Sequence, residues 1–355
     1  MSNQTSGSSS NLGANVPYSR PGTPHPQHQL GFCGVGNMGK RMALNLAKSL
    51  GERQPPLPPL LVWNRTASKV RDLEKESNGL IKAVDDLETL GQACDVVFTN
   101  VADDDAANHV YDALIKGDSK RQQSTGSQHV VWVDTSTLYP TTTGELERRI
   151  SAIPHHSFLS APVFGPPPMA ETAKLVFAVA GPHSAKKQVA PFLVPAMGRK
   201  IMDFGANPER AASFKLIGNA MILSTIEVLS ETMTLAEKTG VGADSFMEFV
   251  TDFFPAPSAI GYGNKLLNQK FDSEEGFTLS GGIKDASHIR RLATSVDCPL
   301  PFIDIAHQHL LSARANAPPG KQLDWSSLVA GQRISSGLPP FSRTQGFERQ
   351  QGRRD

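Results

Sequence analysis

Short apolar runs alternate with helix-like segments over the first part of the chain. Four runs have the length and composition of buried strands: Gln29–Cys33, Leu60–Trp63, Asp95–Phe98 and Val130–Val133. Between the first two runs, Met42, Leu46 and Leu50 fall on one face of a predicted helix. Strands that alternate with helices predict an α/β fold with a doubly wound parallel sheet. Three more strand candidates extend this domain to about residue 206: Phe158–Val163, Lys174–Ala180 and Lys200–Phe204.

A long helix is predicted next. Asn207 suits the N-cap position and Pro208 the first helical position. Apart from Gly218, no breaker interrupts Pro208–Lys238, and Gly240 stands where a C-terminal cap belongs. At 1.5 Å per residue the helix would span roughly 46 Å, enough to connect two domains.

The rest of the chain to about residue 334 has helical patterns only: Phe246–Phe253, Lys284–Ser295, Asp304–Ala315 and a last helix that starts at Asp324–Leu328. We therefore expect a dinucleotide-type domain over residues 29–206 and a smaller all-α domain over residues 207–334. The interdomain helix at about 208–238 would join them. Residues 1–28 and 335–355, rich in small and polar residues and proline, are predicted to be disordered tails.

The charge balance excludes several classes of partner. With 35 Lys and Arg against 34 Asp and Glu, the chain offers no excess charge to a nucleic acid or an anionic membrane surface. No apolar run reaches the roughly 18 residues of a membrane span. The 3 cysteines are too few for a disulfide framework or a zinc cluster, so we expect a cytoplasmic protein.

No metal site is expected. His155 and His156 are adjacent, a spacing that does not direct both rings to one metal from a helix face. The run Asp103–Asp105 lacks the glycine and the closing glutamate of a calcium loop, and is more typical of a helix cap.

A glycine-rich loop, Gly34-Val35-Gly36-Asn37-Met38-Gly39, lies between the first predicted strand and the first predicted helix. This is the context that the dinucleotide-binding fingerprint requires. Gly34 would form the tight turn, Gly36 would admit the pyrophosphate, and Gly39 would let helix and strand pack closely. The first N–H groups of the helix would face the phosphates. The glycines could serve packing alone, but their position favours dinucleotide binding.

The residues after the second strand bear on which dinucleotide is bound. An NAD site usually carries an acid there for the ribose 2′-hydroxyl, whereas an NADP site offers a cation to the 2′-phosphate. This chain has Asn64-Arg65-Thr66. Arg65 could pair with the phosphate, and Asn64 and Thr66 could add hydrogen bonds. NADP is therefore preferred and NAD is possible, with the alternative that Arg65 is only a solvated residue at a strand end.

Lys215 and Asn219 are candidates for acid–base chemistry. They are four residues apart on the long helix and so project from one face. Hydride transfer to a carbonyl carbon leaves an oxygen that needs a proton, and burial lowers the pKa of a lysine towards neutrality. Taken alone, a lysine on an amphipathic helix is more often a surface residue that extends its amine into water.

Four segments resemble the β-hydroxyacid dehydrogenase family, which includes 3-hydroxyisobutyrate dehydrogenase and glyoxylate/succinic semialdehyde reductase and is related to 6-phosphogluconate dehydrogenase. They are Gly31–Gly39 with Met42–Ala47, Asp134–Thr137, Phe214–Asn219 with Glu231–Ala236, and Lys284-Asp285. In order and spacing the resemblance covers about residues 29–333.

The resemblance implies a Rossmann-like domain, a helical domain and an active site in the cleft between them. It makes Lys215 the catalytic lysine and Asn219 its substrate-orienting neighbour. It implies that Val101, Ala102, Thr137 and Lys284 bind the cofactor and that Ser136 and Asp285 lie at the substrate. It also implies a homodimer or homotetramer with a small-molecule substrate.

One segment departs from the family pattern. Many members read Asp-Ala-Pro-Val-Ser-Gly-Gly and hold a substrate carboxylate there, whereas this chain reads Ser160-Ala-Pro-Val-Phe-Gly-Pro166. Phe164 removes a hydroxyl group and Pro166 removes a backbone donor. Phe164 and Gly165 could face a larger or more apolar substrate, or the segment could be a rearranged surface turn.

These observations predict an NADPH-dependent oxidoreductase that interconverts a small carbonyl compound and a hydroxy acid, with Lys215 as general acid and base. An imine reductase is one alternative, although many of those replace the family lysine, and Lys215 therefore favours carbonyl chemistry. A non-catalytic NADP-binding protein is the other alternative.

Overall fold

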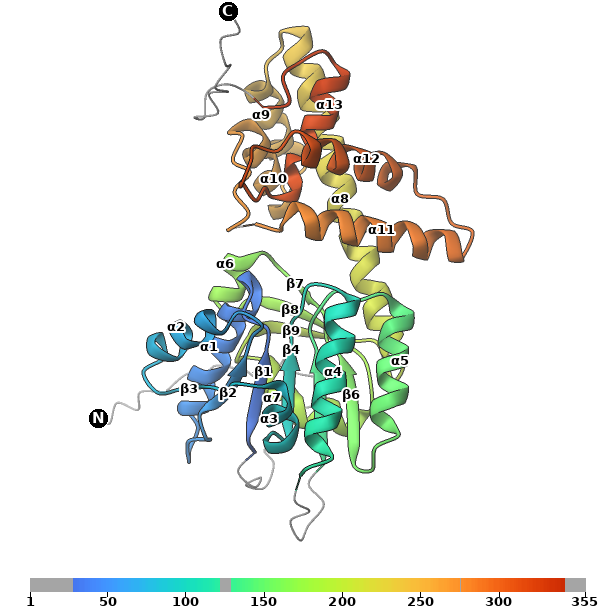
Figure 1. Ribbon diagram of the computed structural model, residues 1–355. Helices are drawn as coiled ribbons and strands as arrows, with labels where there is room; N and C mark the ends of the chain where they lie inside the picture. Colours follow the sequence, from blue (N-terminus) through green and yellow to red (C-terminus); the bar gives the residue numbers. More distant parts are fainter. Residues whose placement is uncertain (1–27, 122–128, 275, 342–355) are drawn as a thin grey trace, which may run out of the picture. The chain divides into compact units, whose positions relative to one another are not determined.

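The computed structural model describes residues 28–121, 129–274 and 276–341. The chain divides into two compact units between Ala212 and Ser213, which is six residues after the expected boundary at 206. The first unit is an α/β domain and the second is helical (Figure 1).

Six parallel strands form the main sheet of the first unit, in the order β3-β2-β1-β4-β5-β6. The strands are β1 (Leu30–Cys33), β2 (Leu60–Trp63), β3 (Ile81–Ala83), β4 (Val96–Thr99), β5 (Val130–Asp134) and β6 (His156–Ser160). This order is that of a doubly wound dinucleotide-binding fold. The predicted Rossmann-like class is therefore confirmed.

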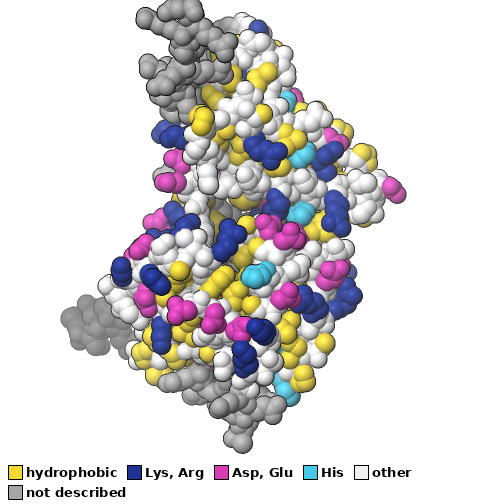
Figure 2. All heavy atoms as spheres, in the orientation of Figure 1, with side chains coloured by type: hydrophobic (Ala, Val, Ile, Leu, Met, Phe, Trp, Pro, Cys, Tyr) yellow, Lys and Arg dark blue, Asp and Glu magenta, His cyan; other side chains and the backbone are white. Residues whose placement is uncertain are grey.

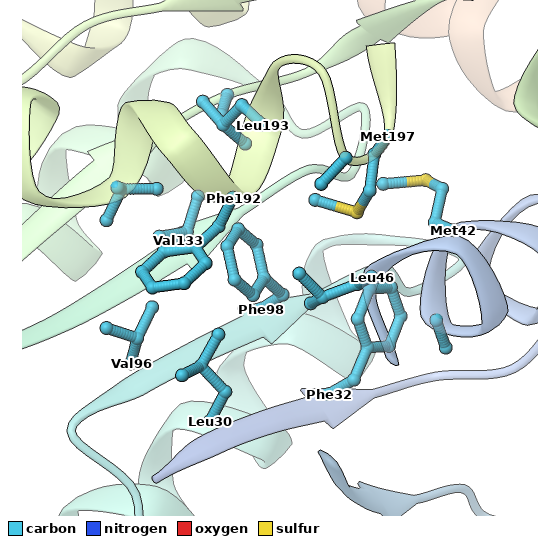
Figure 3. Close-up of a cluster of buried hydrophobic side chains, with 14 of the residues drawn as sticks. Leu30, Phe32, Met42, Leu46, Val96, Phe98, Val133, Phe192, Leu193 and Met197 are labelled. Carbon is cyan, nitrogen blue, oxygen red and sulfur yellow. The ribbon is translucent and has the colours of Figure 1, made fainter. Parts of the chain in front are cut away.

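Helices cover both faces of this sheet (Figure 1). The helices are α1 (Asn37–Gly51), α2 (Ala67–Glu76), α3 (Leu87–Ala93), α4 (Asp104–Asp118), α5 (Pro140–Ser151), α6 (Pro167–Glu171) and α7 (His183–Leu193). Because alternate strand residues point to opposite faces, Phe98 packs with Leu46 of α1 and Phe192 of α7 (Figure 3), whereas Val97 belongs to a second cluster with residues of α3, α4 and α5. The predicted cap is confirmed, since Asp103 accepts from Ala106 N at the start of α4.

Two strand predictions need correction. The expected strand Phe158–Val163 is two strands, β6 and the short β7 (Val163–Phe164), because Pro162 has no N–H to continue the ladder. β7, β8 (Leu175–Val179) and β9 (Gly198–Asp203) form a separate three-stranded sheet. β3 was not predicted, since three residues with Lys82 at the centre give no apolar run.

The second unit is built around α8 (Pro208–Thr239), the predicted long helix. It is followed by α9 (Ala243–Phe253), α10 (Pro257–Leu267), α11 (Leu279–Ser295), α12 (Pro301–Ala315), a 3₁₀ turn (Trp325–Leu328) and α13 (Val329–Ser335). Gly240 has a φ of +77°, as its predicted capping position requires. α10 was not predicted, because Gly261 and Gly263 interrupt its helical pattern.

α8 is long and apolar enough to cross a membrane by length and composition alone, with a mean hydropathy of 1.3 in its most apolar window. The sequence predicts no such stretch, since charged residues interrupt its apolar runs. The buried face of α8 carries Asn219, Glu227 and Ser230, each hydrogen-bonded to protein atoms. The most apolar window of α8 is 39% buried, and one helix of this kind is weak evidence for a membrane span.

The expected tails lie largely outside the described residues. Residues 335–341, predicted as the start of the second tail, are described and in contact with the second unit: Arg333 Nε donates to the Pro339 carbonyl oxygen at 2.9 Å, and the Phe341 and Phe271 rings are 5.7 Å apart. On the face of the molecule in Figure 2, basic and acidic side chains are intermixed. This agrees with the net charge of +1.

Candidate functional site

The loops that follow β1, β2, β4 and β5 share one edge of the main sheet. These strands are parallel neighbours in the order β2-β1-β4-β5, so their carboxyl ends meet there. The order of connections reverses between β1 and β4, and this is the switch point at which α/β sheets bind ligands. All cofactor residues predicted in the first unit lie on these loops or in the first turn of α1: Gly34–Gly39, Asn64–Thr66, Val101, Ala102 and Thr137.

The three glycines of the first loop differ in the space around their Cα atoms. Gly34 has a φ of +96°, and a Cβ there would lie 2.1 Å from the Asn100 carbonyl oxygen. A Cβ on Gly39 would lie 1.9 Å from the Gly34 carbonyl oxygen, whereas one on Gly36 would meet nothing within 4 Å. Gly36 is the N-cap of α1 and makes no side-chain cap bond, so first-turn N–H groups are left for an anion. The loop fits a dinucleotide pyrophosphate.

Asn64 connects the second loop to the glycine loop. Its Oδ1 accepts from Val35 N at 3.0 Å, and its Nδ2 donates to the Thr66 carbonyl oxygen at 3.2 Å. The amide therefore joins the two loops, and one Nδ2 hydrogen remains for the cofactor contact that the sequence predicts.

Arg65 and Thr66 are exposed at the start of α2. Arg65 has no hydrogen bond or ion pair with any residue that the structure describes. Thr66 is the N-cap of α2 but does not cap it with its side chain, and the first turn of α2 contains no acidic residue. A guanidinium beside the positive end of a helix is well suited to a phosphate dianion.

A hydrogen-bond network holds the loops after β4 and β5 together. Ser136 Oγ accepts from Val101 N at 2.9 Å. Asp134, 2 % exposed, accepts from Ser136 N at 2.8 Å and from the Tyr111 hydroxyl at 3.2 Å. Burial raises the pKa of Asp134 to about 7, although the hydrogen bonds from Ser136 and Tyr111 lower it. Beside this network, Ala102 is exposed and Thr137 is half-buried.

In the second unit, four polar residues form a continuous chain of contacts. Lys215 Nζ donates to Asn219 Oδ1 at 2.8 Å, and Asn219 Nδ2 donates to Asp285 Oδ2 at 2.6 Å. The other oxygen of Asp285 is paired with Lys284 Nζ at 2.9 Å. The helical spacing predicts the first contact, and α11 supplies the other two residues.

The surroundings of Lys215 set the pKa of its amine. Burial lowers the pKa of Lys215 from 10.5 to about 8. The Asp285 carboxylate raises that pKa and the Lys284 ammonium lowers it. An amine with a pKa near 8 can both donate and accept a proton close to neutral pH.

The orientation of Asn219 follows from its neighbours. Because Asp285 needs a donor and Lys215 needs an acceptor, the amide has one possible orientation. Asp285 is fully buried, and both of its oxygens face protein partners. The geometry therefore favours a positioning role for Asp285 over the predicted substrate contact.

The Phe164–Gly165 turn follows β6 in the chain. Directly after β6, Ala161 N donates to the Asp134 carbonyl oxygen of β5 at 2.7 Å, which keeps this part of the chain beside β5. Phe164 and Gly165 are half-buried, and Gly165 has a φ of +131°. This conformation explains why glycine stands there.

Two residues of the site were missed from the sequence. Asp134 was seen only as part of a family segment, and its position directly after a buried strand is the available signal. Asn100, whose Nδ2 donates to the Thr135 carbonyl oxygen at 3.2 Å, also follows a buried strand. The contacts of Asp134 with Tyr111 and of Asn100 with Thr135 cannot be derived from spacing, because the partners are 23 and 35 residues apart.

Comparison with known proteins agrees with this geometry. Residues 29–205 match the family model described as the NAD binding domain of 6-phosphogluconate dehydrogenase. Residues 210–330 match the model described as NAD-binding of NADP-dependent 3-hydroxyisobutyrate dehydrogenase.

Individual proteins are similar over most of the chain. An oxidoreductase of Bacillus subtilis, YfjR, is 30% identical over 85% of this chain and 98% of its own length. The NADH-dependent oxidoreductase ucdB of Aspergillus ustus is 24% identical over 85% of this chain and 98% of its own length.

Solved structures share the fold. A 3-hydroxyisobutyrate dehydrogenase from Salmonella typhimurium superposes with a TM-score of 0.71 at 17% identity, over 85% of this chain and 99% of its own. A Streptomyces aurantiacus imine reductase superposes with a TM-score of 0.54 at 20% identity, over 85% of this chain and 98% of its own.

Proposed function

The chain belongs to the β-hydroxyacid dehydrogenase family, and from that premise we propose that it transfers hydride reversibly between NADPH and a small carbonyl or hydroxy-acid substrate, with Lys215 as general acid and base. It is an oxidoreductase that acts on CH–OH groups and uses a nicotinamide cofactor. The observation that carries the proposal is the contact chain from half-buried Lys215 to the buried residues Asn219 and Asp285.

The bound nicotinamide supplies or accepts the hydride, and the residues of the chain manage the proton. In reduction, the protonated Nζ of Lys215 donates to the carbonyl oxygen and becomes a neutral amine. In oxidation, the neutral Nζ takes the proton from the hydroxyl group. Asn219 has one Nδ2 hydrogen left after its bond to Asp285, and we assign that hydrogen to the substrate oxygen.

NADPH is the proposed cofactor because of Arg65 and Thr66, with the glycine loop on the pyrophosphate and Val101, Ala102, Thr137 and Lys284 on the nicotinamide side. The Arg65 guanidinium, which pairs with none of the residues that the structure describes, supports this choice. The similarity to an NADH-dependent oxidoreductase makes NADH the natural comparison in every assay.

We further propose a cytoplasmic homodimer. The support for a dimer is an exposed apolar stripe on α8, since Met221, Val228 and Leu235 are seven residues apart and 70%, 43% and 62% exposed. The support for the cytoplasm is the absence of disulfides among the cysteines, all of which are described and free.

The proposal is tested by a screen of NADPH and NADH oxidation with short aldehydes, 2-oxo acids, 3-oxo acids and cyclic imines. For any substrate found, Lys215→Met should lower kcat about 100-fold or more, because the proton donor is lost. The Kd for NADPH should change less than twofold, by our rough estimate. Lys238→Met, at an exposed lysine of the same helix, is the matched control.

Wild-type turnover in Lys215→Met would remove the general-acid role. Imine reduction is the second candidate, favoured by the apolar residues around Phe164. Faster turnover of the cyclic imines than of every carbonyl compound would establish it in place of carbonyl reduction.

A further inference from the structure

The segment that follows β6 contains no polar side chain. Residues 161–170 read Ala-Pro-Val-Phe-Gly-Pro-Pro-Pro-Met-Ala, so they supply no hydroxyl, amide, carboxylate or basic group. Within it, Pro166 and Pro168 are exposed, and Phe164 and Met169 are half-buried. Apart from Gly165, the other residues of the segment are buried, so the apolar side-chain surface that it offers at this ligand-binding edge comes from Phe164, Pro166, Pro168 and Met169.

Both ends of the segment are fixed to the cofactor edge. At its start, Ala161 N donates to the Asp134 carbonyl oxygen, next to the Ser136–Thr137 loop. At its end, Asn45 of α1 donates from Nδ2 to the Ala170 carbonyl oxygen at 2.7 Å. α6 consequently lies beside α1 (Figure 1), the helix that begins at the glycine loop. The segment thus runs along the edge where the cofactor loops open.

The turn also lacks backbone donors. Pro166, Pro167 and Pro168 have no N–H, and the N–H groups of Met169 and Ala170 both donate to the Pro166 carbonyl oxygen, at 2.9 and 3.3 Å. Gly165 is therefore the only residue from 165 to 170 with an N–H to offer.

No cation on α1 compensates for this. Arg41 is the basic residue that reaches α6, and its Nε faces Glu171 Oε2 at 3.7 Å while its Nη1 donates to the Asn37 carbonyl oxygen at 2.7 Å. A carboxylate set against the turn would lose its hydration and gain from residues 165–170 only the Gly165 N–H, which is unfavourable.

We propose that the turn Phe164–Pro168 forms an apolar wall of the substrate site, which selects carbonyl substrates with an uncharged alkyl or aromatic substituent over substrates with a carboxylate. This inference rests on the proposed function, and it specifies the substrate class of the same site. Phe164 supplies the face against which the substituent packs, and the three prolines keep that face rigid.

The test compares two substrates with the same aldehyde chain, one ending in an uncharged methyl ester and the other in a carboxylate: methyl 4-oxobutanoate and 4-oxobutanoate. The wild-type enzyme should show a kcat/KM about tenfold or more higher for the ester, mainly through a lower KM, because the acid must bury an unpaired charge. The double variant Phe164→Ser/Pro166→Gly restores a hydroxyl and an N–H. It should bring the two values within about threefold of each other.

Phe302→Ser, an equivalent exchange at an exposed residue of α12, should keep the wild-type ratio. Equal or better use of the acid by the wild-type enzyme would overturn the apolar wall and leave the proposed function intact. That comparison needs no variant to fold. If neither these aldehydes nor any other carbonyl compound is reduced with NADPH or NADH, the proposed function fails, and this inference fails with it.

Discussion

The protonation state of Lys215 sets the pH range in which each direction of the reaction can run. Its pKa is lowered from 10.5 to about 8 by burial, so the amine is charged below that pH and neutral above it. Carbonyl reduction needs the charged form and should decline as pH rises through about 8. Alcohol oxidation needs the neutral form and should increase over the same interval. Profiles of kcat against pH in both directions test this, and parallel profiles would contradict it.

The two charged neighbours of Lys215 should move this midpoint in opposite directions. Asp285→Asn removes a charge that raises the lysine pKa, so the midpoint should fall, whereas Lys284→Met removes a charge that lowers it, so the midpoint should rise. A general loss of structure would reduce kcat without such opposed shifts. Shifts in the same direction would show that these residues do not act on Lys215 by charge.

Arg65 should decide between the two dinucleotides. Arg65→Asp places a negative charge beside the 2′-phosphate and should raise the KM for NADPH about tenfold or more, with less than about a twofold change for NADH. Arg71→Ala, at an exposed arginine of α2, the helix that follows Arg65, should alter neither value. An equal effect of Arg65→Asp on both cofactors would assign Arg65 to the solvated surface instead.

At the scale of elements, two glycines at the turn between β1 and α1 have different roles: Gly39 allows close packing, whereas Gly36 leaves room for the cofactor. Gly39→Ala forces a Cβ against the Gly34 carbonyl oxygen and should lower Tm by about 5 °C or more. Gly36→Ala meets open space, so it should leave Tm within about 2 °C while weakening cofactor binding, because it fills the room for a phosphate. Thermal scans and NADPH titrations of both variants test this. A Gly36→Ala protein with unchanged affinity would place the pyrophosphate elsewhere.

Elements with strong local signals could be predicted from the sequence. α8 was predictable because a good start at Pro208 is followed by no strong breaker, and β1 and β4 because they are continuous apolar runs. β3 and α10 were not, since one is three residues long and the other contains two glycines. Pro162 shows a limit of the opposite kind, because it divides the mostly apolar run Phe158–Val163 into two strands.

The same limit applies to the site. Lys215 and Asn219 could be placed together because helical spacing alone makes them neighbours. The contact of Asn219 with Asp285 joins residues 66 positions apart, and only the packing of α11 against α8 determines it. The contact of Asn64 with Val35 was not predicted for a related reason, since Val35 lies on another loop.

At the scale of the whole molecule, the outer face of α8 remains to be explained. A core helix of a monomer needs apolar residues on its buried side only, yet Met221, Val228 and Leu235 repeat every seven residues on the exposed side. Such a stripe is self-complementary across a two-fold axis, which is the arrangement of most homodimers. The exposed aromatic residues of α9, Phe249 and Phe253, add to the apolar surface of the second unit.

The dimer is tested by placing charge in the centre of this stripe. Wild-type protein should elute in size-exclusion chromatography with light scattering at twice the mass of one chain. Met221→Glu/Leu235→Glu should shift the protein to the mass of a single chain at low micromolar concentration, because each chain would bury two negatively charged side chains at the interface. Val296→Glu, at an equally exposed apolar residue outside α8, should remain dimeric. Circular dichroism confirms that the variants keep their helices. A folded double variant at dimer mass would place the interface on another face, and a monomeric wild type would leave the stripe free for a different partner.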